Sequence, residues 1–134
     1  MGSEQQSRHR DEVEVRMPAD RRFVAALRSL TSSLAAQCDL TVDEIEDLQI
    51  AVDEAAALLL PHAAQPDGWL AARFGLTVGC LDVVTSVPAP PQAMPDRTGF
   101  SWTVLSALAD RLEVITAEGV LAIGITKQRE TSDQ

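Results

Sequence analysis

Residues 41–62 read Thr-Val-Asp-Glu-Ile-Glu-Asp-Leu-Gln-Ile-Ala-Val-Asp-Glu-Ala-Ala-Ala-Leu-Leu-Leu-Pro-His, and this stretch decides the fold. Thr41 and Glu44 have the spacing of a capping box, in which each side chain bonds the other residue's backbone N–H. Apolar residues then recur every three or four positions, which places them on one helix face: Ile45, Leu48, Val52, Ala55 and Leu59. The pattern predicts an amphipathic helix over residues 42–60.

The flanking segments predict a small sheet and two further helices. Alternating polar and apolar residues predict strands over residues 12–17, 69–77, 81–87, 112–116 and 120–126. Helical spacing predicts a helix after Asp20 and another over residues 101–111. Four prolines within residues 88–99 exclude a helix or a central strand there. This order predicts a two-layer α/β sandwich, in which a mixed, mostly antiparallel sheet is covered on one face by three helices.

Composition limits the class of protein. The chain has 134 residues and a formal net charge of −9, which predicts one acidic domain over residues 12–128 between flexible tails at 1–11 and 129–134. The charge argues against nucleic acid as a partner. No apolar run reaches the length that spans a bilayer, so we expect no membrane partner and a cytoplasmic location. Cys38 and Cys80 are expected to be free thiols, with a redox switch as the less favoured alternative.

Common catalytic and metal-binding motifs are absent from the sequence. Neither of the usual glycine-rich phosphate loops occurs, and no C-x-x-C or H-E-x-x-H pattern is present. His9 lies in the predicted tail and His62 stands alone, so we expect no zinc site. One constellation remains, the run from Asp53 to His62 late in the predicted helix.

Three segments carry a resemblance to a known family. They are Leu48 to Ala55, Phe100 to Asp110 and Ile125-Thr126-Lys127. With the element order, they resemble the anti-sigma-factor serine kinases of the RsbW/SpoIIAB type in the GHKL ATPase superfamily, in particular the actinobacterial branch. The resemblance covers residues 13–127 and implies the GHKL, or Bergerat-like, ATPase fold.

The family's helix motif, E-x-x-x-N-x-x-x-H, is matched only in part. The resemblance implies that Glu54 is the position of the general base and His62 that of the histidine, while Leu58 replaces the asparagine that holds Mg²⁺. A leucine offers no oxygen to a hard cation, so we expect no metal site here. Glu54 could equally be a solvated carboxylate, His62 a residue at the helix end, and Leu58 a core residue.

The two glycine-rich family motifs are also degenerate. The resemblance implies that Ser86 stands near the position of the aspartate that contacts adenine, and residues 85–91 contain no Asp or Gly. Arg97 and Gly99 match the phosphate loop, in which Ser101 replaces the second glycine. With His62 and Thr126, these are the degenerate ATP-site positions. We therefore expect no cofactor, and ATP with Mg²⁺ only if the site still works.

The resemblance implies partners as well as chemistry. We expect an anti-sigma factor that sequesters an alternative sigma factor by direct binding, and that a STAS-type anti-anti-sigma protein displaces by partner switching. A homodimer is expected. Candidate partner contacts are Arg21, Arg22, Arg28 and Arg97, which could also be solvated. The alternative is an active ATP-dependent serine kinase that phosphorylates the anti-anti-sigma factor, and a third class is a pseudo-ATPase scaffold or small-molecule sensor.

Overall fold

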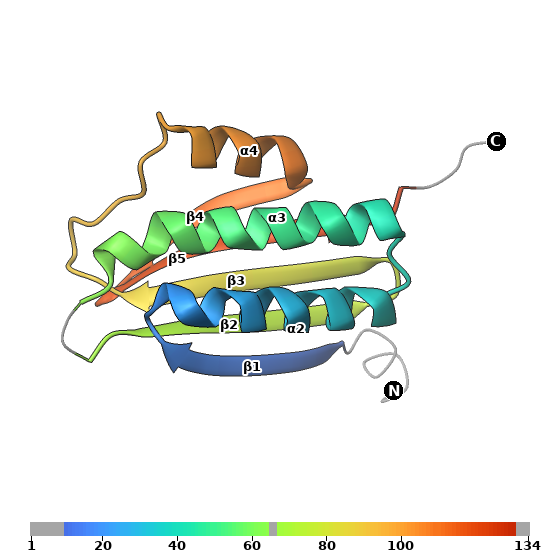
Figure 1. Cartoon of the computed structure of the whole chain (residues 1–134), viewed down its shortest axis with the longest axis horizontal. Coiled ribbons are helices and arrows are strands. Elements are labelled where there is room, and N and C mark those ends of the chain that lie inside the picture. The colour runs from blue at the N-terminus through green and yellow to red at the C-terminus, as the bar shows by residue number, and fades with distance from the viewer. Residues whose placement is uncertain (1–9, 65–66, 131–134) are drawn as a thin grey trace, which may run out of the picture.

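The computed structural model describes residues 10–64 and 67–130 as a sheet and a layer of helices (Figure 1). The sheet has five strands in the order β1-β2-β3-β5-β4, and each neighbouring pair is antiparallel. The strands are β1 (Asp11–Pro18), β2 (Trp69–Thr77), β3 (Cys80–Pro88), β4 (Arg111–Ala117) and β5 (Val120–Gln128). The predicted α/β sandwich is confirmed, and its five strands are antiparallel throughout rather than mixed.

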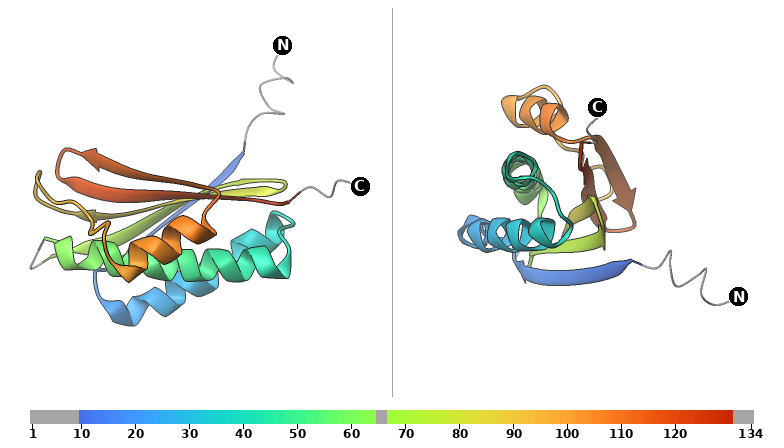
Figure 2. Two further views of the ribbon diagram at one scale, coloured as in Figure 1. Left: turned by 90° about the horizontal axis from the view of Figure 1, so that it is seen from above. Right: turned by 90° about the vertical axis from the view of Figure 1, so that its right-hand side faces the viewer.

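Three helices cover one face of this sheet, as predicted (Figure 2). They are α2 (Val24–Gln37), α3 (Val42–Leu59) and α4 (Phe100–Leu108). A short 3₁₀ turn, η1 (Arg21–Phe23), precedes α2, and a second, η2 (Leu60–His62), follows α3. Figure 1 shows α3 between α2 and α4, so that α3 is the central helix of the layer. The opposite face of the sheet carries no helix among the described residues.

The capping box that starts α3 is present. The Thr41 hydroxyl accepts the backbone N–H of Glu44 at 3.2 Å, and the Glu44 carboxylate accepts the backbone N–H of Thr41 at 2.8 Å. Asp20 likewise accepts the N–H of Arg22 at 2.9 Å and caps η1. Both helix starts were predicted correctly because they depend on side chains two or three residues away.

The core lies between the helices and the sheet. Strand residues alternate between this core and the open face, as the burial of β3 shows along its whole length. Phe74 of β2, Val83 of β3 and Ile123 of β5 are fully buried and belong to the same apolar cluster as Leu48 and Val52 of α3. Cys38 is also buried and Cys80 is half-buried, and both are free thiols.

The third helix ends earlier than predicted. The prediction ran over residues 101–111, but α4 ends at Leu108 and Arg111 already belongs to β4. The Lys127 ammonium donates to the carbonyl oxygen of Leu108 at 2.8 Å. Asp110, which precedes β4, is bonded to β5: its N–H donates to the Thr126 carbonyl at 2.9 Å and its carboxylate accepts the N–H of Gln128 at 2.7 Å. Contacts from a distant strand therefore end this helix.

The ends of the described chain are bonded to the domain. Asp11 pairs with Leu76 in the sheet register, and the Arg10 guanidinium is ion-paired with Asp82. At the other end, the N–H of Arg129 donates to the Gly79 carbonyl at 2.7 Å, and that of Glu130 to the Glu44 carboxylate at 2.7 Å. These four residues were assigned to flexible tails, and the sheet and α3 hold them instead. The rest of the predicted tails, residues 1–9 and 131–134, lies outside the described residues.

The proline-rich segment packs onto the core. Ala89, Ala93 and Pro95 are buried, and the N–H of Ala89 donates to the Gly119 carbonyl at 3.0 Å.

Among the described helices, none is both long and apolar enough to cross a membrane.

Candidate functional site

A cleft of about 480 Å³ opens at one end of the helix layer. Its walls come from all three helices and from the turns beside them, and they combine two arginines, two carboxylates and a hydroxyl with apolar side chains. The lining residues are Arg21, Val24, Ala25, Arg28, Asp53, Glu54, Ala57, Leu60 and Ser101. The fold therefore brings together four residues that the sequence singled out, namely Arg21, Arg28, Glu54 and Ser101.

An ion pair spans this cleft between α2 and α3. The Nε atom of Arg28 lies 3.0 Å from both carboxylate oxygens of Asp53. The two side chains are 40% and 35% exposed, so solvent reaches the pair and a competing carboxylate could too. Such a partly exposed ion pair contributes at most about 1 kcal/mol to the free energy of unfolding. Asp53 therefore orients the Arg28 side chain without preventing it from binding another group. Glu54, which lines the same cleft, has no ion-pair partner among the described residues.

Leu58 lies in the core, one turn beyond Glu54. It is 8% exposed and belongs to the same apolar cluster as Ala55 and Leu59. The residues present do not fit the Mg²⁺ that the family resemblance implies, because Leu58 has no oxygen and the nearby Asp53 carboxylate is held by Arg28. Within residues 10–64 and 67–130, no group of three or more His, Cys, Asp and Glu side chains is arranged to hold a metal.

His62 does not continue the helix face of Glu54 and Leu58. Helix α3 ends at Leu59, and Pro61 lies in the tighter 3₁₀ turn that carries His62. His62 is half-buried and is not among the residues that line the cleft.

Ser86 and Thr126 lie on the other side of the sheet from Glu54. In β3 the buried, helix-facing positions are Leu81, Val83, Thr85 and Val87, so Ser86 faces the open side. It lines a shallow hollow of about 630 Å³ there. The Thr126 hydroxyl donates to Asp82 at 2.6 Å within a separate notch of about 300 Å³. The structure therefore does not bring these two residues into one site with Glu54, although both were grouped with it from the sequence.

Arg97, Gly99 and Ser101 surround the start of α4. Gly99 is the N-cap residue, and a Cβ atom there would lie 3.2 Å from the Asp96 carboxylate. Hydrogen bonds from the Thr98 hydroxyl and N–H lower the pKa of Asp96. The Arg97 guanidinium lies 5.2 Å from the centre of the Trp102 ring, an arrangement typical of a cation–π contact. Of the three predicted residues, only Ser101 lines the cleft.

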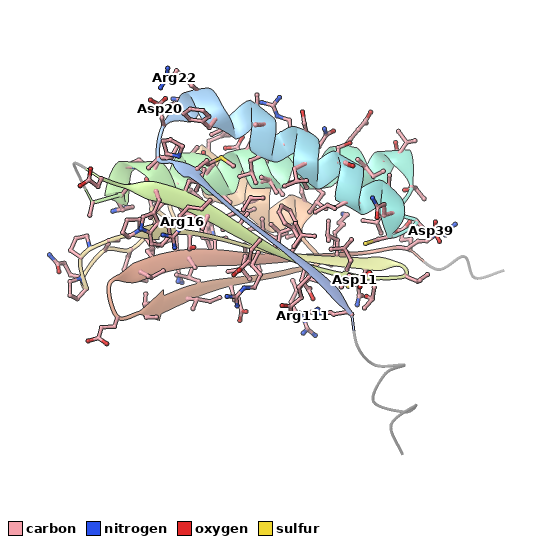
Figure 3. The ribbon with its side chains drawn as sticks, turned by 90° about the horizontal axis from the view of Figure 1, so that it is seen from below. Asp11, Arg16, Asp20, Arg22, Asp39 and Arg111 are labelled. Atoms are coloured by element: carbon pink, nitrogen blue, oxygen red, sulfur yellow. The ribbon has the colours of Figure 1, made fainter. Side chains whose placement is uncertain are left out.

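Arg21 and Arg22 differ in position. Figure 3 shows Arg22 beside Asp20 at the start of α2, and the Arg22 Nε atom lies 3.3 Å from the Asp20 carboxylate. Arg22 also lies 5.2 Å from the centre of the Phe23 ring. Arg21 lines the cleft, whereas Arg22 does not.

Asp53 of α3 and Lys127 of β5 were not among the predicted site residues, although both lie in segments that the sequence singled out. Asp53 pairs with an arginine 25 residues away, and no local pattern signals that contact. Lys127 is 8% exposed and reaches the Asp47 carboxylate at 3.3 Å as well as the end of α4. The alternation of β5 could have located Lys127, because it shares the helix-facing side with Ile123 and Ile125.

Comparisons with known proteins agree with this fold. No family model matches the chain. The serine-protein kinase RsbW of Bacillus subtilis is 37% identical over 78 residues, which are 57% of this chain and 49% of that relative. The serine-protein kinase RsbW of Bacillus thuringiensis is 25% identical over 142 residues, covering 90% of this chain and 88% of the relative. The first of these matches thus spans about half of the relative's length.

A solved structure shows the same fold. It contains the RsbU and RsbW domains of Rv1364c from Mycobacterium tuberculosis, with a TM-score of 0.63 and 17% identity, and the likeness covers 92% of this chain and 34% of that one. The five-stranded antiparallel sheet with its helices on one face is therefore a fold that this solved structure shares. The chain is thus similar in sequence to serine-protein kinases named RsbW and similar in fold to a structure that contains an RsbW domain.

Proposed function

We propose that this chain is an anti-sigma factor. It binds an alternative sigma factor directly, and a STAS-type anti-anti-sigma protein releases the sigma factor by competing for an overlapping surface. Support comes from the similarity to RsbW proteins and from the cleft between the helices. In the cleft, the partly exposed Arg28 and Arg21 can bond carboxylates of either partner. Two mutually exclusive partners of different affinity suffice for such a switch.

The burial of Leu58 carries the second part of the proposal, which is that nucleotide binding has been lost. The family's motif has an asparagine at this position, and its oxygen holds Mg²⁺. Here that oxygen would have to take the place of a leucine that is only 8% exposed and lies in an apolar cluster. Ser86 lies on the far side of the sheet from the cleft. In addition, the Ala89 N–H is already bonded to Gly119, so it is not available to a phosphate. Phosphoryl transfer depends on metal ions to neutralise developing charge, and these residues supply no such ligand set.

An active serine kinase is the second candidate. Two observations support it: the relatives are named serine-protein kinases, and Glu54, which the resemblance implies is the general base, lines the cleft. The two candidates differ in whether the chain needs Mg-ATP to act on the anti-anti-sigma protein.

The experiment uses the purified chain with the alternative sigma factors and STAS proteins of its source organism, each tested singly. We expect a stable complex with a sigma factor, displacement by one STAS protein, and no phosphoserine on that protein after incubation with Mg-ATP. Calorimetric binding of Mg-ATP tighter than about 100 µM, together with serine phosphorylation, would establish the kinase instead. Failure of every sigma factor to bind would leave the scaffold or sensor class.

The location and assembly of the protein are part of the proposal. A regulator of sigma factors works in the cytoplasm, where RNA polymerase is found. We propose that the chain acts as a homodimer, and sedimentation equilibrium over a range of concentrations tests this directly.

A further inference from the structure

Helix α3 carries six carboxylates and no cationic side chain. Three of them are used within the chain: Glu44 in the capping box, Asp47 with Lys127, and Asp53 with Arg28. The other three, Asp43, Glu46 and Glu54, have no ion-pair partner among residues 10–64 and 67–130. The central helix of the layer therefore carries three carboxylates outside these ion pairs, and one of them, Glu54, shares the cleft with Arg21 and Arg28.

The three carboxylates share one face of α3 with two apolar residues. The positions are 43, 46, 50, 54 and 57, and their spacings of three, four, four and three residues keep them within one stripe. We call this the α3 stripe: Asp43, Glu46, Ile50, Glu54 and Ala57. Four of these residues are exposed and Glu54 is half-buried, whereas the buried residues of α3 lie on the opposite side of the helix.

Ile50 lies at the centre of the α3 stripe. Its side chain is 45% exposed, although it is a large apolar group on the outer side of the helix. Glu46 lies one turn before it and Glu54 one turn after it. Beyond Ile50 the stripe enters the cleft, because Glu54 and Ala57 are among the lining residues. An apolar centre, unpaired carboxylates on both sides and an adjoining hollow are features of a protein-binding surface.

We propose that the α3 stripe is the surface on which a basic helix of the partner docks. That helix carries an apolar residue that covers Ile50, with Lys or Arg four residues before and after it to meet Glu46 and Glu54. Charge selects this occupant, since a nucleic acid or an anionic lipid surface would be repelled by the unpaired carboxylates. The inference rests on the proposed function, because it places the sigma factor on this stripe and on the adjoining cleft.

The test compares variants of the full chain for binding to the sigma factor that the wild-type chain retains. Ile50→Gln removes the apolar centre and Glu46→Lys reverses one charge, and both positions are on the helix surface. Val78→Gln and Glu118→Lys are the matched controls, since Val78 is 85% exposed and Glu118 is exposed, each in a turn of the sheet. We expect Kd to rise about fivefold for Ile50→Gln and about tenfold for Glu46→Lys, with both controls within twofold of wild type.

A photoreactive residue gives a second readout. Placed at position 50, it should crosslink to a helix of the sigma factor that has the basic–apolar–basic spacing, whereas at position 78 it should not. If the sigma factor binds wild type and all four variants equally and position 50 gives no crosslink, the docking surface is elsewhere and the proposed function stands. If no sigma factor binds the wild-type chain, the proposed function fails and this inference fails with it.

Discussion

Leu58 is the residue at which the chemistry of the chain departs furthest from what the family resemblance implies. An asparagine amide carries donors and an acceptor that need partners once they are buried. Leu58 is 8% exposed and belongs to a cluster of apolar side chains. The position therefore serves packing, and a change back to asparagine would meet a site that is closed to water.

Replacing Leu58 by asparagine should destabilise the protein without creating a nucleotide site. We expect Leu58→Asn to lower the free energy of unfolding by about 2–4 kcal/mol, since it removes buried methyl groups and buries an amide. Urea denaturation measures the loss, and calorimetry with Mg-ATP tests binding. Ala57→Asn at the exposed neighbouring position is the control and should cost less than about 1 kcal/mol. A stable Leu58→Asn protein that binds Mg-ATP would contradict the interpretation.

The cysteines give a second prediction about single residues. Burial raises the pKa of the Cys38 thiol, and burial also raises that of Cys80, so both have less thiolate at a given pH. Because the thiolate is the reactive form, Cys38 in the folded protein should react with iodoacetamide at pH 8 at least about tenfold more slowly than in urea. Mass spectrometry of timed samples measures this, with Cys80→Ser to isolate Cys38. Equal rates in folded and unfolded protein would overturn it.

Among the elements, α3 depends most on its first turn. Burial of the Glu44 carboxylate would by itself raise its pKa, but hydrogen bonds from the N–H groups of Thr41 and Glu130, the Thr41 hydroxyl and the charge of Lys127 outweigh this and lower the pKa. The same carboxylate therefore caps α3 and holds the end of the described chain. Its charge also lies at the positive end of the helix dipole.

This arrangement predicts a pH-dependent contribution to stability. A carboxyl whose pKa is lower in the folded than in the unfolded protein stabilises the fold above its unfolded value near 4.5, and the stabilisation is lost as the pH falls through the folded pKa. Glu44→Gln should therefore lower Tm at pH 7, and its difference from wild type should shrink steadily below about pH 4.5. Thermal unfolding between pH 3 and 8 measures it. Glu46→Gln, which lacks these bonds, should show little change, and a pH-independent difference would refute the role of the charge.

The start of α3 and the end of α4 show what can be predicted at the scale of elements. The start of α3 was predicted from Thr41 and Glu44 alone, because both partners of the capping box are local. The end of α4 was placed wrongly at residue 111, because the groups that end it come from Lys127 and Gln128 of β5. Local patterns contain no information about which distant strand will lie beside a helix end.

For the whole molecule, charge is the property that a partner meets first. The net charge is −9, and α3 contributes carboxylates that the described fold leaves unpaired. A basic partner should be attracted over a distance of about 10 Å at 0.1 M salt, which is the range of unscreened interaction. The rate of association should then depend on salt more strongly than the rate of dissociation.

Stopped-flow mixing with the retained sigma factor tests this expectation. Between about 50 mM and 500 mM NaCl, we expect the association rate constant to fall by about tenfold or more and the dissociation rate constant to change much less. Sodium sulfate at matched ionic strength is the control for specific ion effects. An association rate that is independent of salt would show that acidity plays no part in recognition, whichever surface the partner uses.

The sequence by itself determined which segments form helices and strands, and that position 58 of the site has no oxygen to bind a metal ion. Capping, alternation and helical spacing act between residues at most four apart, and the absence of an oxygen at Leu58 is a property of one side chain. Only the tertiary structure decided which candidates meet. It placed Ser86 and Thr126 on the open face of the sheet, away from Glu54, and it paired Arg28 with Asp53. The physical reason is strand register and helix packing, which join residues far apart in the chain, and a shift of one position would turn each strand side chain to the opposite face.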